Sequence, residues 1–221
     1  MLRIGLTGDL GSGKSTVARM FAERGAVVLS SDEMGRVMMQ PGEAVYAAIV
    51  ERFGKGVMAA DGFLDRRKLA RLVFQEGRVE ELNAIVHPAV IGEQARLIAE
   101  MASSKPDATV VVESALIFTT KYAPGGEPWS KRFDRVVLVT ASEAEKISRY
   151  VERVAGGRTL SAEERGSLEG DARKRLAMQA VNEEHAAECL VIRNDEGLDG
   201  LERQVEAVWS QLEHLRGEQT R

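Results

Sequence analysis

Short apolar runs alternate along the chain with longer segments in which apolar residues recur at helical spacing. The runs cover residues 3–7, 26–29, 109–113, 135–140 and 189–192, and each predicts a buried β-strand. Helical spacing covers residues 16–24, 43–53, 65–74, 78–86, 89–101, 161–179 and 198–215, and the segment from 142 to a glycine pair at 156–157. Strands that alternate with helices predict an α/β fold with a doubly wound, five-stranded parallel sheet.

Two helical regions interrupt this alternation. Residues 43–102 contain no convincing strand, and with the helix before them they predict an inserted helical subdomain over 33–102. Within it, Asp65 is expected to cap one helix, and Pro88 is expected to end another. Residues 142–182 predict a helical lid: two helices with capping boxes that start at Ser142 and Ser161, joined through a glycine hinge. Residues 1–32, 103–141 and 183–216 form the core of a single domain spanning 1–221.

Composition and charge narrow the class of protein. Hydrophobic residues make up 44% of the chain and charged residues 29%, which is typical of a soluble globular protein. The net charge of −4 argues against a nucleic-acid partner. No apolar run is long enough to span a membrane, and without a signal peptide the expected location is cytoplasmic. The single cysteine, Cys189, is interpreted as a small buried residue. Residues 122–131 predict an exposed loop.

The first strand continues directly into Gly8-Asp9-Leu10-Gly11-Ser12-Gly13-Lys14-Ser15, which fits the P-loop pattern G-x-x-x-x-G-K-[ST]. The glycines allow successive backbone amides to face a phosphate, and the following helix presents its N-terminus to the same anion. Lys14 is expected to reach the β- and γ-phosphates, and Ser15 to ligate Mg²⁺. A helix-capping turn would explain the glycines but not Lys14 and Ser15. A dinucleotide fingerprint is excluded, because G-x-G-x-x-G does not fit these glycines.

Two carboxylates follow predicted strands at the edge where α/β sheets bind ligands. Asp32 follows the second strand and is a candidate to accept a proton from an attacking hydroxyl; a role as helix N-cap is equally consistent with its position. Arg36, one turn later, suits an anionic substrate, although a solvated arginine is the commoner case. Glu113 ends the third strand, where an acidic residue orders Mg²⁺ in many P-loop proteins.

Basic residues mark two further candidate regions. Arg149 and Arg153 share one face of the first lid helix and are expected to neutralise charge on the γ-phosphate, unless the lid is an ordinary charged hairpin. Arg66 belongs to a basic cluster whose simpler interpretation is a solvated helix face. For His87, a structural hydrogen bond at a helix end is favoured from the sequence alone.

Taken together, these residues resemble the dephospho-CoA kinase family along nearly the whole chain. The matching positions are residues 5–8, 11–16, Asp32, Arg36, Pro41, Gly42, Leu64, Asp65, Arg66, Leu69, Phe74, Leu82, Ile85, His87, Pro88, Leu116, Ile117, Phe118, Arg149, Arg153, Gln179 and Asn194. A P-loop alone fits many proteins, whereas this ordered set is specific.

The resemblance implies transfer of the γ-phosphoryl group of ATP to the ribose 3′-hydroxyl of dephospho-CoA, with Mg²⁺, in a monomer or small homo-oligomer. It implies that Asp32 is the base and that Arg149 and Arg153 act from the lid. It implies an acceptor side with Arg36, Arg66 and His87. It also implies nucleotide contacts from Gly11, Ser12, Gly13, Lys14, Ser15, Thr16, Arg153 and Asn194.

Several positions depart from the family pattern. Ser30-Ser31-Asp32 stands where the family usually has Asp-Ala-Asp, and Asp9 replaces a usual glycine beside the phosphate loop. Ala115, Thr119 and His185 replace a usual proline, glutamate and lysine, and the lid near 154–160 is enlarged. Another P-loop kinase, acting on a nucleoside monophosphate or another small alcohol, remains the nearest alternative. An ATP-dependent switch protein is a more distant one.

Overall fold

The computed structural model describes residues 1–122 and 126–219, which divide into two compact units. The first unit comprises Met1–Leu29, Met101–Thr119 and Trp129–Arg221, and the second comprises Ser30–Glu100 and Thr120–Pro128. Within the described residues, none of the helices combines the length and the hydrophobicity needed to cross a membrane.

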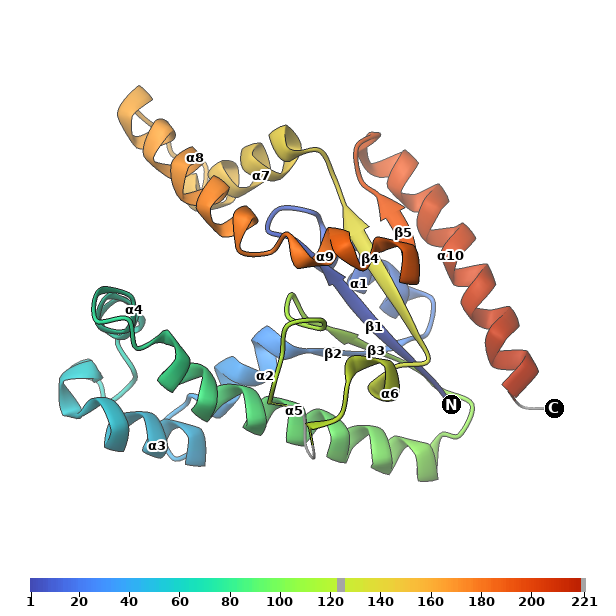
Figure 1. Ribbon diagram of the computed structural model, residues 1–221, viewed down its shortest axis with the longest axis horizontal. Helices are drawn as coiled ribbons and strands as arrows, with labels where there is room; N and C mark the ends of the chain where they lie inside the picture. The colour runs from blue at the N-terminus through green and yellow to red at the C-terminus, as the bar shows by residue number, and fades with distance from the viewer. Residues whose placement is uncertain (123–125, 220–221) are drawn as a thin grey trace. The chain divides into compact units, whose positions relative to one another are not determined.

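A five-stranded sheet confirms the predicted α/β class (Figure 1). Its strands are β1 (Leu2–Gly8), β2 (Val27–Ser30), β3 (Thr109–Glu113), β4 (Arg135–Thr140) and β5 (Leu190–Arg193). They lie in the order β2-β3-β1-β4-β5, and β1 pairs in parallel with both β3 and β4. Ile4 is paired with Val111 and Leu6 with Val137, so the strand that leads into the glycine-rich loop lies at the centre of the sheet.

The core of the first unit is formed by β1 and two helices, α1 (Lys14–Glu23) and α10 (Gly197–Gln219). Leu6 and Leu212 are fully buried, and the rings of Phe21 and Trp209 lie 5.6 Å apart. This packing follows from the helical spacing of apolar residues in both helices. Helix α10 extends to Gln219, beyond its predicted end at residue 215.

The predicted lid is a hairpin of α7 (Glu143–Ala155) and α8 (Ala162–Ala177), visible in Figure 1. Gly156 and Gly157 adopt φ angles of 58° and 82°, which L-residues with a side chain rarely adopt, and they end α7 as predicted. Ser161 forms the complete capping box with Glu164. The lid has its own apolar cluster, built on Ile147, Tyr150, Val151 and Ala172. A short helix, α9 (Val181–Glu184), and a 3₁₀ turn, η3 (Ala186–Glu188), lead on to β5.

The second unit is mostly helical, and it begins at Ser30 and includes Thr120–Pro128, whereas the predicted insertion spans 33–102. It contains α2 (Ser31–Met38), α3 (Ala44–Phe53), η1 (Lys55–Val57), α4 (Arg66–Gln75) and most of α5 (Val79–Ser104). Its buried apolar cluster is formed by Val45, Ile49, Phe53, Val57, Leu69 and Val73. Asp65 caps α4 as predicted, because its carboxylate accepts the amides of Arg67 and Lys68 at 3.1 and 3.0 Å.

The prediction that Pro88 separates two helices is wrong, because α5 runs through it without interruption. A proline inside a helix removes one backbone hydrogen bond and crowds the preceding turn, which costs about 3 kcal/mol. Apolar residues on both sides of the proline offset this cost. Before the proline, Leu82 and Val86 pack against the core of the second unit. After the proline, Val90 and Ile91 are buried. Tertiary packing therefore overrides the local signal.

Two smaller expectations also change. Of the predicted loop at 122–131, residues 123–125, including Pro124 and Gly125, lie outside the described part, and a short helix, α6 (Trp129–Arg132), occupies its end. Cys189 precedes β5 and is only half-buried. Its thiol donates to the carbonyl of His185 at 3.2 Å, and burial raises the pKa of this thiol to about 11. A raised pKa disfavours the thiolate, which is the reactive form, at neutral pH.

Candidate active site

The P-loop lies between β1 and α1, and its glycines adopt conformations that other residues would strain. Gly11 and Gly13 have φ angles of 73° and 98°. A Cβ atom at Gly8 would lie 2.3 Å from the carbonyl oxygen of Val139, so only glycine lets β4 approach the start of the loop this closely. A Cβ at Gly13 would lie 2.3 Å from the side-chain nitrogen of Asn194, Nδ2.

Side chains from distant parts of the sequence hold this loop in place. Asn194, after β5, donates its side-chain amide to the carbonyl of Ser12 at 3.0 Å. Gln179 accepts the amide of Leu10 at 2.7 Å. Arg149, on α7, donates to the carbonyl of Asn194 at 2.8 Å and contacts that of Gly11 at 3.5 Å. The structure therefore brings Arg149 and Asn194 to the loop, and their roles toward a nucleotide stay predictions.

Three features of the loop suit an anion. Gly13 is the N-cap of α1 and has no side chain that could occupy the first amides of the helix. Among the described residues, the buried hydroxyl of Ser12 is one of three buried side-chain polar atoms that have no hydrogen-bond partner. The stem of Lys14 lies against Gly8, with Cγ 3.2 Å from where a Cβ of that glycine would be. An exposed helix N-terminus, an unpartnered hydroxyl and an ammonium group together fit a phosphate.

Ser15 and Glu113 form the pair that the sequence predicts for a magnesium ion. The hydroxyl of Ser15, in the first turn of α1, donates to Glu113 Oε1 at the end of β3 at 2.6 Å. Within the described chain, no cluster of three or more His, Cys, Asp or Glu side chains forms a metal cage. Mg²⁺ does not need such a cage, because it keeps several waters and binds one or two protein oxygens together with phosphates. The donors present therefore fit this ion.

Asp32 lies in the first turn of α2 with an exposed side chain, and it does not cap the helix. The N-cap is Ser30, whose hydroxyl accepts the amide of Glu33 at 3.5 Å, so the capping interpretation of Asp32 is wrong. The adjacent Ser31 accepts a hydrogen bond of 2.9 Å from the buried Gln94 of α5. This bond holds the start of α2 against α5. Because Ser30 is the cap, the Asp32 carboxylate has no capping role.

The other predicted acceptor residues lie in the same unit as Asp32. Arg36 is exposed on α2 and pairs with Glu33 at 3.3 Å. Helix α2 packs on α5 at Gly35, where a Cβ would lie 3.8 Å from both Val86 and Val90. His87 therefore lies on α5 between two residues that contact α2.

His87 is half-buried, and burial lowers the pKa of its imidazole, while the charge of Glu80 opposes this effect. The ring of Tyr122 lies 5.5 Å away in an edge-to-face arrangement. Arg66 is the first residue of α4 and is exposed. His87 thus presents a neutral imidazole at pH 7, and Arg66 a cation.

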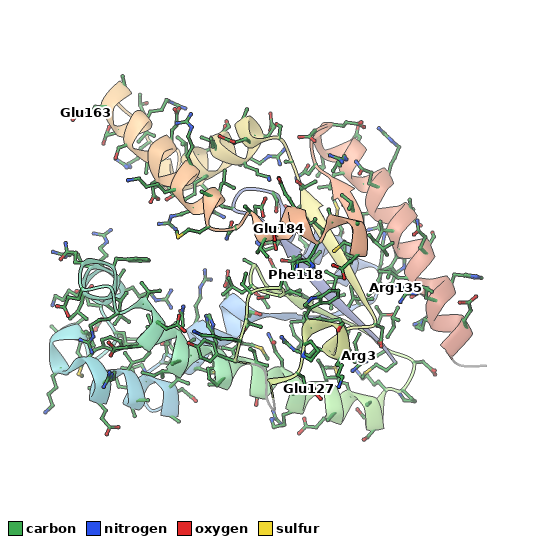
Figure 2. All side chains as sticks on the ribbon, in the orientation of Figure 1. Arg3, Phe118, Glu127, Arg135, Glu163 and Glu184 are labelled. Atoms are coloured by element: carbon green, nitrogen blue, oxygen red, sulfur yellow. The ribbon has the colours of Figure 1, made fainter. Side chains whose placement is uncertain are left out.

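Arg153 is exposed on α7, and its guanidinium lies 5.8 Å from the centre of the Tyr150 ring. Arg149, one turn earlier, contacts the P-loop, so the structure brings one of the two lid arginines to the loop. Phe118, labelled in Figure 2, belongs to the first unit. Its ring stacks on the ring of His185, with the ring centres 4.4 Å apart, and the ring of Trp129 lies edge-on to it at 5.2 Å.

Sequence reasoning missed one buried polar cluster beside the loop. Asp9 accepts hydrogen bonds from Lys146 Nζ at 2.6 Å and from the side-chain amide of Asn182 at 2.7 Å. A signal was present, because Lys146 interrupts the apolar face of α7 that Ile147, Tyr150 and Val151 define. A lysine inside an apolar stripe indicates a buried partner.

The first unit thus combines a P-loop between a central strand and its helix, a hydrogen bond between Ser15 and Glu113 at the edge of the sheet, and an arginine from the α7–α8 hairpin. These features define a P-loop phosphotransferase. A sequence model of the dephospho-CoA kinase family matches residues 2–200, and the chain belongs to this family.

Individual relatives agree with this assignment. A dephospho-CoA kinase of Streptomyces avermitilis is 39% identical over 216 residues, covering 97% of this chain and 95% of the relative. One from Mycolicibacterium paratuberculosis is 36% identical over 213 residues, which are 96% of this chain but 47% of that longer protein. A crystal structure from Thermus thermophilus matches with a TM-score of 0.66 at 31% identity and covers 96% of this chain and 97% of its own.

Proposed function

We propose that this chain transfers the γ-phosphoryl group of ATP to the ribose 3′-hydroxyl of dephospho-CoA, which gives coenzyme A and ADP, the last step of coenzyme A biosynthesis. The observation that carries the proposal is the family match over residues 2–200, along which the P-loop and its surrounding contacts are intact. We assign the whole chain, 1–221, to one kinase domain. In it, residues 33–102 form the acceptor side and 142–182 the lid.

The nucleotide is bound by the P-loop and its neighbours. Residues 11–16 receive the phosphates at the N-terminus of α1, where the amides of Ser12 and Thr16 close turns of the loop, and Lys14 neutralises charge on the β- and γ-phosphates. Asn194 keeps the loop open for this purpose, because it holds the Ser12 carbonyl away from the phosphates. Phosphoryl transfer needs little covalent chemistry from the protein, so positioning and charge account for most of the catalysis.

Ser15 and Glu113 would hold Mg²⁺ at the β- and γ-phosphates. When bound, this ion would supply positive charge beside the phosphates and would stabilise the negative charge that develops during transfer. The 2.6 Å bond between the two side chains supports this role, because it keeps both oxygens at one edge of the sheet.

On the acceptor side, the Asp32 carboxylate accepts the proton of the ribose 3′-hydroxyl as that oxygen attacks the phosphorus atom. Its exposure, and the cap supplied by Ser30 in its place, leave this carboxylate available. Arg36 and Arg66 bind anionic groups of the acceptor, and the neutral imidazole of His87 donates or accepts a hydrogen bond.

The lid arginines act on the transferring group. Arg149 is already held at the loop by its bonds to Gly11 and Asn194, and Arg153 reaches the phosphates from one turn further along α7. Arginines in this position stabilise transition-state charge, and such residues contribute about 10³-fold or more to turnover. A closed lid also excludes water, which would otherwise accept the phosphoryl group.

The proposed setting is the cytoplasm, with ATP and dephospho-CoA as small-molecule partners and with neither nucleic acid nor a membrane involved. The protein acts as a monomer or a small homo-oligomer. The net charge of −4 supports the absence of a nucleic-acid partner.

The decisive experiment incubates the protein with dephospho-CoA, ATP and Mg²⁺ and detects coenzyme A by mass. A panel of nucleoside monophosphates and small alcohols is assayed in parallel through ADP release. Preferential conversion of dephospho-CoA supports the proposal. Faster conversion of another acceptor, or ATP turnover that ignores dephospho-CoA and responds only to a protein partner, would replace it.

A further inference from the structure

The second residue of the P-loop carries a buried charge. Asp9 is 5% exposed and Lys146 is 4% exposed, and their side chains form an ion pair of 2.6 Å. Asn182 binds the other carboxylate oxygen of Asp9 at 2.7 Å. Both oxygens of the carboxylate therefore have a donor, one from α7 and one from α9.

The backbone of Asp9 also shapes the loop. Its carbonyl accepts the amide of Ser12 at 3.1 Å, which closes the turn that directs the following amides toward a phosphate. The carboxylate thus anchors the residue on which this turn begins. A shift of Asp9 would move the Ser12 amide with it.

The two residues after Asp9 are tied to the same segments. Leu10 packs into the apolar cluster of the lid, and its amide donates to Gln179. Gly11 lies against the backbone of Lys146, where a Cβ would be 2.2 Å from the Lys146 carbonyl oxygen. Three consecutive loop residues therefore depend on the lid hairpin and the segment after it, and the ion pair is the charged member of this set.

Electrostatics gives the pair a second role. A lone carboxylate in a loop that binds a triphosphate would repel the ligand, and a lone buried charge of either sign is strongly unfavourable. Lys146 neutralises the charge of Asp9 by direct contact, with 2.6 Å between its Nζ and the carboxylate oxygen. A pair of neutral residues would remove the repulsion equally well, but it would not tie the loop to α7.

We propose that the Asp9–Lys146 ion pair, completed by Asn182, is a latch that positions the P-loop for ATP by fastening it to the lid helix α7. Asp9, Lys146 and Asn182 are positioning residues, because they act through the loop backbone. The inference rests on the proposed function for its setting, although ATP binding alone is sufficient to test it.

The test separates the latch from a merely stabilising ion pair. The double variant Asp9→Ala/Lys146→Met removes both charges, and neutral replacements of buried pairs often leave stability unchanged. We expect its thermal stability to stay close to that of the unmodified chain. Its dissociation constant for ATP, measured by calorimetry without acceptor, should rise by about tenfold. Its KM for dephospho-CoA should change less than about twofold.

Lys146→Arg is the conservative rescue. Asp9 and Lys146 line a cavity of about 560 Å³, which leaves room for the larger guanidinium. ATP affinity within about threefold of the original is expected, because the charge pair persists. Lys174→Met, an exposed lysine of α8, is the matched control and should leave ATP affinity unchanged.

Asn182→Ala removes one of the two donors to Asp9 and leaves the ion pair, so it tests the latch even where the double variant does not fold. A rise of about threefold in the ATP dissociation constant is expected. The latch is overturned if the double variant or Asn182→Ala binds ATP as tightly as the original chain. Failure of the original chain to phosphorylate dephospho-CoA while it binds ATP would overturn the proposed acceptor and leave the latch standing.

Discussion

At the residue scale, the helix-capping role for which Asp32 was a candidate belongs to Ser30, two positions earlier in the chain. Both residue types are common N-caps, and the sequence does not say which of them ends the strand and which enters the helix. Extended backbone at Ser30 makes it the cap. Asp32 consequently lies in the first turn of α2, where an exposed carboxylate contributes only a small dipole interaction to the helix.

Asp32→Asn should lower kcat by about 10²-fold or more, because the amide cannot accept the hydroxyl proton. ATP affinity should be unchanged, since the nucleotide contacts are made by the P-loop. Steady-state kinetics with dephospho-CoA and ATP calorimetry measure the two quantities. Glu43→Gln, which neutralises another exposed carboxylate of the same unit, is the control. A kcat equal to that of the original enzyme would remove Asp32 from the chemistry.

His87 predicts a pH dependence of stability. Burial lowers its pKa below the ordinary 6.5, so below pH 6.5 the unfolded chain binds more protons than the folded one. The stability contributed by the neutral imidazole is therefore complete above pH 6.5 and is lost as the pH falls toward the folded pKa. Thermal melts of His87→Gln should decline less steeply between pH 6.5 and 5 than those of the original chain. Parallel slopes would show that His87 does not titrate in this way.

At the scale of elements, the sequence predicted those helix ends that are determined by local capping interactions. Asp65, Ser161 and Gly156 sit at helix ends because their side chains or their backbone freedom satisfy terminal groups. The continuity of α5 through Pro88 was missed, because it depends on apolar contacts made by both halves of the helix after folding. Similarly, Lys146 needs a partner 137 residues away, and no local pattern names Asp9.

Pro88→Ala tests whether α5 tolerates its proline only through packing. Alanine restores a backbone donor and has a higher helix propensity, and the loss of proline rigidity in the unfolded chain opposes part of this gain. A net stabilisation of about 1–2 kcal/mol is expected in denaturant unfolding followed by circular dichroism. Ala89→Gly, at the neighbouring position, should destabilise by about 1 kcal/mol. Destabilisation by Pro88→Ala would mean that the proline ring itself makes an essential contact.

At the scale of the whole molecule, the strand count, the parallel sheet and the two helical regions followed from periodicity, because each is repeated over many residues. The order of the strands did not, since periodicity carries no information about which strands pair. Gln179 and Asn194 were singled out only by a family resemblance, and the structure shows that each makes a hydrogen bond to the backbone of the P-loop.

ATP should stabilise the chain by mass action. At a free concentration about 100 times its dissociation constant, a ligand adds about 2.7 kcal/mol, which for a chain of this size raises Tm by about 5–10 °C. Differential scanning fluorimetry with ATP and Mg²⁺ measures this shift. Lys14→Ala should lose most of it, whereas Lys55→Ala, an exposed lysine far along the sequence, should keep it. An undiminished shift in Lys14→Ala would contradict the role given to that ammonium group.

Each of the two units contains an apolar cluster of its own, with Leu6 and Leu212 buried in one and Ile49 and Val57 in the other. On the proposed assignment, substitutions in the acceptor-side helices can therefore change the alcohol that is accepted while the core around the P-loop keeps its packing. A lineage that changed its acceptor would start from a chain already competent to hold its donor.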